Sequence, residues 1–175
     1  DMVVSCGSRL QTGFVGTPYL LHVLSSYGHT DLAYTLLLRT EYPSWLYPVT
    51  KGATTVWEHW DGIMENGDFW STDMNSFNHY AYGAVADWVY EEAAGIHTVE
   101  EAPGFERVKI APKPDSRLDW LEAFIETRKG LVRSLWKQEE GRFRYEITTP
   151  SPASIVIDGV ETQVGPGEYI FYSRI

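Results

Sequence analysis

The sequence has few basic residues in its first part, a single cysteine and no long apolar run. Residues 1–100 contain 3 Lys or Arg against 12 Asp or Glu, and the whole chain of 175 residues has a formal net charge of −10. Proteins bind nucleic-acid phosphates through Lys and Arg, so this balance argues against a nucleic-acid partner. Residues 101–175, with 11 basic and 12 acidic residues, are close to neutral.

The other scarcities exclude further classes. A membrane-spanning helix needs about 18 or more consecutive apolar residues, and the best candidate, Tyr19 to Leu24, is short and contains His22, so we expect no membrane insertion. Cys6 has no second cysteine with which to form an internal disulfide, and it does not indicate a compartment. Because the chain starts at Asp1 without a leader, we expect that more of the polypeptide precedes it.

Apolar residues at helical spacing predict two helices near the N-terminus. Thr17 is the expected N-cap of the first, Pro18 its first helical residue and Gly28 its end. Thr30 or Asp31 caps the second, which is apolar around almost its whole circumference, as in a buried helix. The pair is a helical hairpin. Even with the third helix predicted below, the helices cannot cover the apolar second one well, so we expect further helices from the preceding part of the polypeptide.

The helical periodicity disappears between residues 41 and 74, where Pro and Gly interrupt a run of aromatic and acidic residues, and we expect a long ordered loop there. A third helix is predicted to begin at Asn75 or Ser76, because apolar residues recur at helical spacing from Phe77 onwards. Gly95 is expected to end it.

Beyond Pro103 the periodicity changes to two, which predicts strands separated by turns such as Asp158-Gly159. The expected domains are therefore a helical one, residues 1–102, and a small antiparallel β domain, residues 103–175. The predicted strands cover residues 105–110, 118–127, 131–137, 142–148, 154–157 and 168–172.

Trp120 and Trp136 are expected in the core of the β domain or in its packing against the helical domain. Basic residues at 107–110 and 128–129 are interpreted as charged strand edges, which discourage aggregation, rather than as ligand contacts.

The segment with the most chemistry lies in and around the predicted loop. Of the 25 aromatic residues, 12 fall between Tyr42 and Tyr90, and Glu58 to Asp73 contains five acidic residues without a Lys or Arg. Aromatic rings stack on the apolar faces of sugars, while carboxylates and amides bind the hydroxyl groups. Hydrolysis of a glycoside requires two carboxyl groups that flank the bond. This mixture favours a carbohydrate cleft.

Glu58 is the best candidate for a catalytic carboxylate, because Trp57 and Trp60 are placed to shield it and His59 adjoins it. From composition alone, a capping or solvated loop acid is the commoner explanation for such a residue. A metal site is disfavoured, since the spacing fits neither an EF-hand nor a zinc helix motif, and no cofactor is expected. The candidate metal ligands would be His59, Asp61, Glu65 and Asp68.

His79 is expected one turn into the third helix, roughly opposite its apolar stripe and facing the loop. A structural hydrogen-bonding role and a ligand contact both remain open for His79 and for Asn78.

Four segments in this order and spacing together resemble the bacterial α-L-rhamnosidases. The resemblance covers nearly the whole chain, and four separate motifs make it far more specific than any one of them. The segments are Thr12-Gly13-Phe14-Val15-Gly16-Thr17-Pro18, Tyr42-Pro43-Ser44-Trp45, Gly52-Ala53-Thr54-Thr55-Val56-Trp57-Glu58 and Ser76-Phe77-Asn78-His79-Tyr80-Ala81-Tyr82-Gly83.

The resemblance implies a mixed fold, with the C-terminal helices of an (α/α)6 barrel followed by an antiparallel β-sandwich. It also implies an inverting hydrolase of rhamnose-containing glycans, with Glu58 as general base and His79 as a substrate contact in the Asn78-His79 motif. Rings that would line the sugar pocket are Trp45, Trp57 and Trp60.

In that family the general acid comes from an acidic segment much earlier in the barrel, and no segment here matches it. The chain alone is therefore expected to be inactive. Two alternatives stay open: a non-catalytic sugar-binding relative, and another (α/α)6 glycosidase or a polysaccharide lyase. A lyase is disfavoured because residues 52–80 lack the cations that neutralise a uronic acid.

Overall fold

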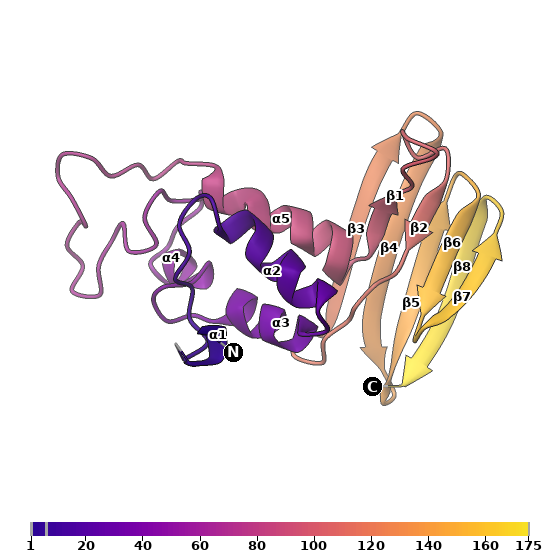
Figure 1. The fold of residues 1–175 in the computed structure, drawn as a ribbon, viewed down its shortest axis with the longest axis horizontal. Coiled ribbons are helices and arrows are strands. Elements are labelled where there is room, and N and C mark those ends of the chain that lie inside the picture. Colours follow the sequence, from indigo (N-terminus) through magenta and orange to yellow (C-terminus); the bar gives the residue numbers. More distant parts are fainter. Residues whose placement is uncertain (1, 6, 175) are drawn as a thin grey trace. The chain divides into compact units, whose positions relative to one another are not determined.

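The chain divides into two compact units, Asp1–Ala86 and Asp87–Ile175. The structure, a computed structural model, describes residues 2–5 and 7–174, so the expectations about Asp1 and Cys6 lie outside the described residues. Figure 1 shows helices and loops in the first part of the chain and strands in the second. Among the helices of the described residues, none is long and apolar enough to cross a membrane.

The predicted helical hairpin is confirmed. After a short α1 (Met2–Ser5), α2 (Thr17–Ser26) and α3 (Thr30–Leu38) lie side by side (Figure 1). Gly28 joins them at a φ of +81°, and the amide of His29 closes α2 with a 2.8 Å bond to a carbonyl one turn back. Their buried side chains include Leu21, Leu24, Tyr34 and Leu36.

The start of α2 differs by one residue from the prediction. Gly16 is the N-cap and Thr17 is the first helical residue. The buried Thr17 hydroxyl lies within 3.0 Å of the carbonyl oxygens of Thr12 and Gly13. It therefore anchors the preceding loop instead of capping the helix.

The region between residues 41 and 74 is irregular, as predicted, except for one short helix, α4 (Leu46–Thr50). The part after α4 projects beyond the helices as a long excursion (Figure 1). An isolated bridge between Ile63 and Phe69 and a turn at Asn66 and Asp68 give it local order.

The third helix begins at Ala81, so the predicted start at Asn75 or Ser76 is wrong. The helix begins as a 3₁₀-helix, continues as an α-helix and ends as a π-helix, so it departs from regular α geometry. Its three parts are η1 (Ala81–Ala84), α5 (Val85–Trp88) and η2 (Val89–Ala93).

Residues 75–80 stay out of the helix because their backbone groups are bonded to another segment. The carbonyl of Ser76 accepts from the Glu58 amide at 2.9 Å, and the amide of His79 donates to the Val56 carbonyl at 2.8 Å. An amide or carbonyl committed in this way is not available to an i to i−4 helical ladder.

The second unit is a β-sandwich of two four-stranded sheets, with strand orders β1-β2-β6-β7 and β3-β4-β5-β8. Neighbouring strands are antiparallel except β2 and β6, which run parallel. The prediction of helices followed by an antiparallel sandwich is confirmed. The strands are β1 (Ile96–Thr98), β2 (Val108–Ile110), β3 (Trp120–Thr127), β4 (Gly130–Glu139), β5 (Arg142–Thr149), β6 (Ala153–Ile157), β7 (Val160–Val164) and β8 (Gly167–Arg174).

Two of these strands, β1 and β7, were not predicted. β1 has only three residues, and β7 is exposed at four of its five positions, so neither has the apolar alternation that marks a half-buried strand. The strand predicted for residues 105–110 is shortened to the three residues of β2.

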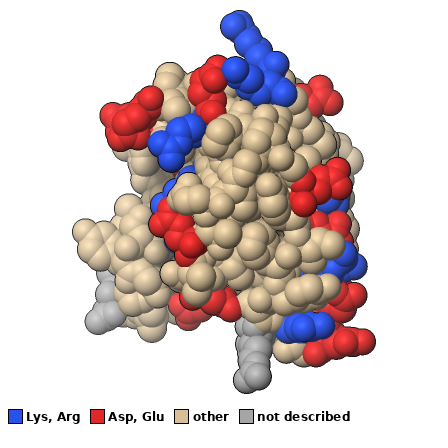
Figure 2. All heavy atoms as spheres, turned by 90° about the vertical axis from the view of Figure 1, so that its right-hand side faces the viewer, with Lys and Arg blue, Asp and Glu red and all other residues tan. Residues whose placement is uncertain are grey.

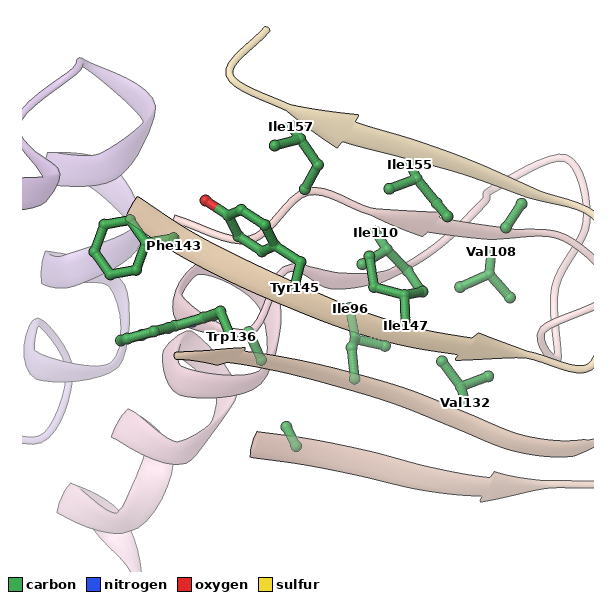
Figure 3. Close-up of a cluster of buried hydrophobic side chains, with 13 residues drawn as sticks. Ile96, Val108, Ile110, Val132, Trp136, Phe143, Tyr145, Ile147, Ile155 and Ile157 are labelled. Carbon is green, nitrogen blue, oxygen red and sulfur yellow. The ribbon is translucent and has the colours of Figure 1, made fainter. Parts of the chain in front are cut away.

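The core of the second unit fills the space between the two sheets (Figure 3). Alternate residues of β4 and β5 point inward, which follows from the period of two along a strand. Trp136 is fully buried and donates through Nε1 to the Ala93 carbonyl at 2.9 Å, so its core placement is confirmed. Trp120, by contrast, is 62% exposed, which contradicts its predicted burial. It lies three residues before the inward-facing Ala123 on the same strand, and side chains an odd number of residues apart point to opposite faces of a sheet, so Trp120 faces outward.

Gly95 follows the third helix, as predicted, and it is required there for two reasons. Its φ of +75° suits glycine, and a β-carbon at this position would come within 2.2 Å of the Ala111 backbone.

Charged residues of both signs lie interspersed around the face shown in Figure 2, which looks onto the side where β6, β7 and β8 lie.

Candidate functional site

Two loop segments of the first unit lie against each other and carry the predicted site residues. Residues 55–58 and 76–79 are joined by the two backbone bonds described above. The hydroxyl of Thr55 donates to the Phe77 carbonyl as a third link. This pairing brings the segment that contains Glu58 beside the segment that contains His79, although about 20 residues separate them in sequence.

Glu58 is half-buried, and its side chain turns toward the second segment. Oε2 accepts a hydrogen bond from the Ser76 amide at 3.2 Å. The bond holds one carboxylate oxygen in a defined place, and a fixed position is what a general base requires. A structural loop acid would make the same bond.

The three tryptophans named from the sequence line one pocket of about 300 Å³, together with residues 53–56. Trp45 and Trp60 meet edge to face, with ring centroids 5.5 Å apart. Trp60 in turn stacks on Tyr82 at 3.7 Å, and the Trp45 indole donates to the Tyr82 carbonyl at 2.9 Å. Tyr82 therefore fixes both rings, which gives the pocket a rigid aromatic wall.

Trp57 has a second role, as packing for the loop. It is 5% exposed and meets Phe77 edge to face at 5.0 Å. Gly62 lies against both rings, because a β-carbon there would come within 3.1 Å of each. Trp57 thus contributes one wall of the pocket while it ties the two loop segments together.

A second hollow, of about 480 Å³, shares Thr55 and Val56 with the first pocket and is also lined by Asn78 and His79. Glu58 is in the lining of neither pocket. The expected helical placement of His79 is wrong, since it precedes η1. Its Nδ1 accepts from the Ala81 amide at 3.3 Å, which places the proton of the neutral ring on Nε2 as a donor.

Phe14 stacks on the His79 ring, with centroids 4.9 Å apart and planes 11° from parallel. The contact sets the ring orientation from the loop before α2. Phe14 also touches Tyr82, with centroids 5.1 Å apart, so a single aromatic network reaches from His79 to Trp60.

His59, which adjoins Glu58 in sequence, and the acidic Asp68 of the same segment make their contacts elsewhere. His59 stacks on Trp70 with centroids 3.6 Å apart. Asp68 accepts a hydrogen bond from the Asn66 side chain in a turn. Local sequence proximity to Glu58 therefore does not decide which side chains face it.

Tyrosines near the pocket keep their protons. Burial raises the pKa of Tyr82, with Tyr42 as a second cause. Burial and then the negative charge of Asp61 raise the pKa of Tyr42. Burial also raises the pKa of Tyr47, whose hydroxyl donates to the Ile63 carbonyl at 3.0 Å. These phenols are neutral hydrogen-bond donors at physiological pH.

Sequence reasoning missed the positioning residues Phe14, Ser76 and Tyr82. Phe14 and Tyr82 stood within the quoted motifs, but their contacts are long-range. Ser76 acts through its backbone amide, which no side-chain pattern reveals.

Both parts of the chain match models of one protein family. Residues 1–93 match a family model described as the bacterial α-L-rhamnosidase six-hairpin glycosidase domain. Residues 95–166 match the C-terminal domain of bacterial α-L-rhamnosidases. The class is thus a helical-hairpin glycosidase domain followed by a β-sandwich. The chain belongs to the bacterial α-L-rhamnosidase family.

Individual relatives agree with this assignment. An α-L-rhamnosidase of Streptomyces avermitilis is 45% identical over 142 residues, which are 81% of this chain and 14% of the relative. An α-L-rhamnosidase of Alteromonas sp. is 40% identical over 86% of this chain and 16% of the relative. The chain therefore spans about a sixth of the length of these relatives.

Solved structures share the fold over nearly the whole chain. A Streptomyces avermitilis α-L-rhamnosidase complexed with L-rhamnose has a TM-score of 0.90 at 36% identity, over 99% of this chain and 19% of that structure. The native enzyme from Aspergillus terreus has a TM-score of 0.92 at 35% identity, over 99% of this chain and 20% of that structure. The predicted fold class, the last helices of the barrel and a β-sandwich, is confirmed.

Proposed function

We propose that the polypeptide of which this chain is a part hydrolyses terminal α-L-rhamnosides with inversion of configuration. The observation that carries the proposal is the pairing of residues 55–58 with residues 76–79. It fixes the Glu58 carboxylate on the Ser76 amide, directly after Trp57, one of the three tryptophans that line the pocket. Family membership and the relative complexed with L-rhamnose support the choice of sugar.

In the proposed reaction Glu58 acts as the general base. Its carboxylate takes a proton from a water molecule as the water oxygen bonds to the anomeric carbon. The glycosidic bond breaks on the opposite face, and a general acid protonates the departing oxygen. An inverting enzyme needs roughly 6.5–9.5 Å between the two carboxyl groups, so that the water fits between base and sugar.

We infer that the general acid lies outside these 175 residues, in the upstream part of the same polypeptide. The isolated chain is therefore expected to be inactive. Hydrolysis of an aryl α-L-rhamnoside by the isolated chain would overturn this inference.

The other site residues are proposed as sugar contacts. Trp45, Trp57 and Trp60 would present ring faces and edges to the apolar side of the sugar. Asn78 and the Nε2–H of His79 would bind hydroxyl groups from the neighbouring hollow. Neither a metal nor a cofactor takes part in the proposed chemistry.

The decisive experiment is Glu58→Gln in the full-length protein, because glutamine keeps the shape and loses the proton acceptor. We expect kcat on an aryl α-L-rhamnoside to fall about 10²- to 10⁴-fold, with the KM for this substrate little changed. Asp73→Asn, an exposed acid of the same segment, is the matched control and should keep full activity. Unchanged turnover in the Glu58 variant would leave Glu58 with the structural role only.

Measurements on the wild-type protein distinguish the non-catalytic alternative from the proposed hydrolase. A sugar-binding relative would bind L-rhamnose, as followed by tryptophan fluorescence, and would show no turnover of any rhamnoside. The observation that favours this alternative is the hydrogen bond from the Ser76 amide to Glu58, because it gives Glu58 a structural role without catalysis.

A further inference from the structure

The outer face of the sheet β3-β4-β5-β8 carries large aromatic rings that the core does not use. Trp120 and Phe124, on the edge strand β3, are 62% and 55% exposed. They point to the same side, because they lie an even number of residues apart on one strand. The four-residue spacing along the strand places the two rings about 13 Å apart, which is enough for each ring to contact a different unit of an extended ligand.

A crevice of about 250 Å³ lies on the same face, across β4, β5 and β8. Phe124 is the cross-strand partner of Arg133, which in turn pairs with Thr148, and Thr148 pairs with Glu168. Arg133, Thr148 and Glu168 all line the crevice, as does Glu146. One cross-strand row therefore leads from an exposed ring into a hollow with charged and hydroxyl groups.

The charges of this face are arranged in pairs. Arg133 is bonded to Glu122 and to Glu146, and Arg144 is bonded to Glu146. An anionic polymer needs an excess of cations, which such pairs do not offer. A protein partner would have to take the pairs out of water at high cost, whereas sugar hydroxyl groups replace water on them without separating them.

We propose that this face, defined by Trp120, Phe124, Arg133 and Glu146, is a second carbohydrate-binding surface that takes neutral glycans. The two rings stack on the faces of two sugar residues, and the paired charges with Thr148 bind hydroxyl groups. The inference goes beyond the proposed function, because binding here requires neither Glu58 nor the tryptophan pocket.

The test is affinity electrophoresis of the full-length protein in native gels containing a rhamnan, a galactomannan or polygalacturonate. We expect at least one neutral polysaccharide to retard the wild-type protein, and polygalacturonate to have no effect. In Trp120→Ala/Phe124→Ala the apparent affinity should be about 10-fold weaker, since buried aromatic contacts dominate such interfaces. Val160→Ala removes an equally exposed apolar side chain from the other sheet and should behave like the wild type.

Three outcomes would overturn the proposal. In the first, neither neutral polysaccharide retards the wild-type protein. In the second, the wild type and the double variant are retarded equally. In the third, polygalacturonate alone retards the protein. The first outcome would mean that another part of the polypeptide covers the face or that it binds no glycan.

The result is independent of the catalytic proposal. Glu58→Gln should keep the retardation that depends on Trp120 and lose hydrolysis, whereas the double variant should keep the hydrolysis of a small aryl rhamnoside. Both side chains are exposed, so the double variant is expected to fold, and its thermal unfolding provides the check.

Discussion

The aromatic rings around the pocket of the first unit and those in the core of the second unit are placed in different ways. In the first unit Phe14 is 43% exposed and Trp70 is 45% exposed, and rings such as Trp60 line a pocket. In the second unit Trp136 and Tyr145 are at most 2% exposed and fill the space between the sheets. Aromatic content is therefore no guide to function by itself. What separates these two groups of rings is periodicity, since the rings of the sandwich core follow the alternation of a strand, whereas the pocket rings lie in or beside irregular loops.

The largest stability effect is expected from Trp136→Ala, which removes a buried ring and its bond to the Ala93 carbonyl. The free energy of unfolding should fall by about 3–5 kcal/mol. Trp120→Ala is the matched control on the neighbouring strand and should cost about 0.5 kcal/mol or less, because that ring is exposed. Urea denaturation followed by circular dichroism measures both. Equal losses would break the contrast between core and surface rings.

Gly95→Ala is expected to follow in size. The substitution strains a left-handed backbone and drives a β-carbon into Ala111, so we expect a loss of about 2–5 kcal/mol. Gly159→Ala shares the φ, +77° against +75°, but has open space around the new carbon. It should cost only about 1–2 kcal/mol, the share due to the backbone. A difference near zero between the two unfolding midpoints would contradict the proposed clash.

A change in the first unit should affect function more than folding. Phe14→Leu removes the ring that stacks on His79, so we expect the KM for an aryl rhamnoside to rise about 2- to 10-fold while kcat changes less. Val15→Ala, next to it and 86% exposed, is the control. Steady-state kinetics of the full-length protein test this. A large fall in stability without a change in KM would instead make Phe14 a packing residue.

The smallest effect concerns acid stability. Hydrogen bonds from Arg117 hold the pKa of Asp115 below its usual 3.8. A lowered carboxyl pKa stabilises the fold above the unfolded value, and this contribution is lost as the pH falls through the folded pKa. Asp115→Asn should therefore reduce stability by less than about 1 kcal/mol at neutral pH, and the difference should fade below pH 3.8. Urea denaturation of the wild type and of Asp115→Asn across this pH range measures the difference, and a difference that stays constant down to low pH would contradict the expectation.

Most of the regular structure was predictable because it is encoded locally. The hairpin of α2 and α3 and the strands β3, β4 and β5 lie close to where apolar spacing placed them. β7 escaped prediction because its residues stay exposed, and the start of the third helix was wrong because bonds from Val56 and Glu58 compete with the helix.

The candidate site was predictable in part. Glu58 and the tryptophans stood out by residue type in an irregular acidic segment. The sequence offered no signal that Ser76 would hold the Glu58 carboxylate or that Phe14 would stack on His79, because both contacts join residues far apart in the chain.

The sequence by itself determined the order of the units, the alternation that buries Trp136 and the candidate status of Glu58, since these follow from local periodicity and residue chemistry. Only the tertiary structure decided that residues 55–58 pair with residues 76–79 and that Trp120 faces outward. The reason is physical: pairing between distant segments depends on which backbone groups and ring faces meet in space, and a one-residue change of register reverses the face of a strand.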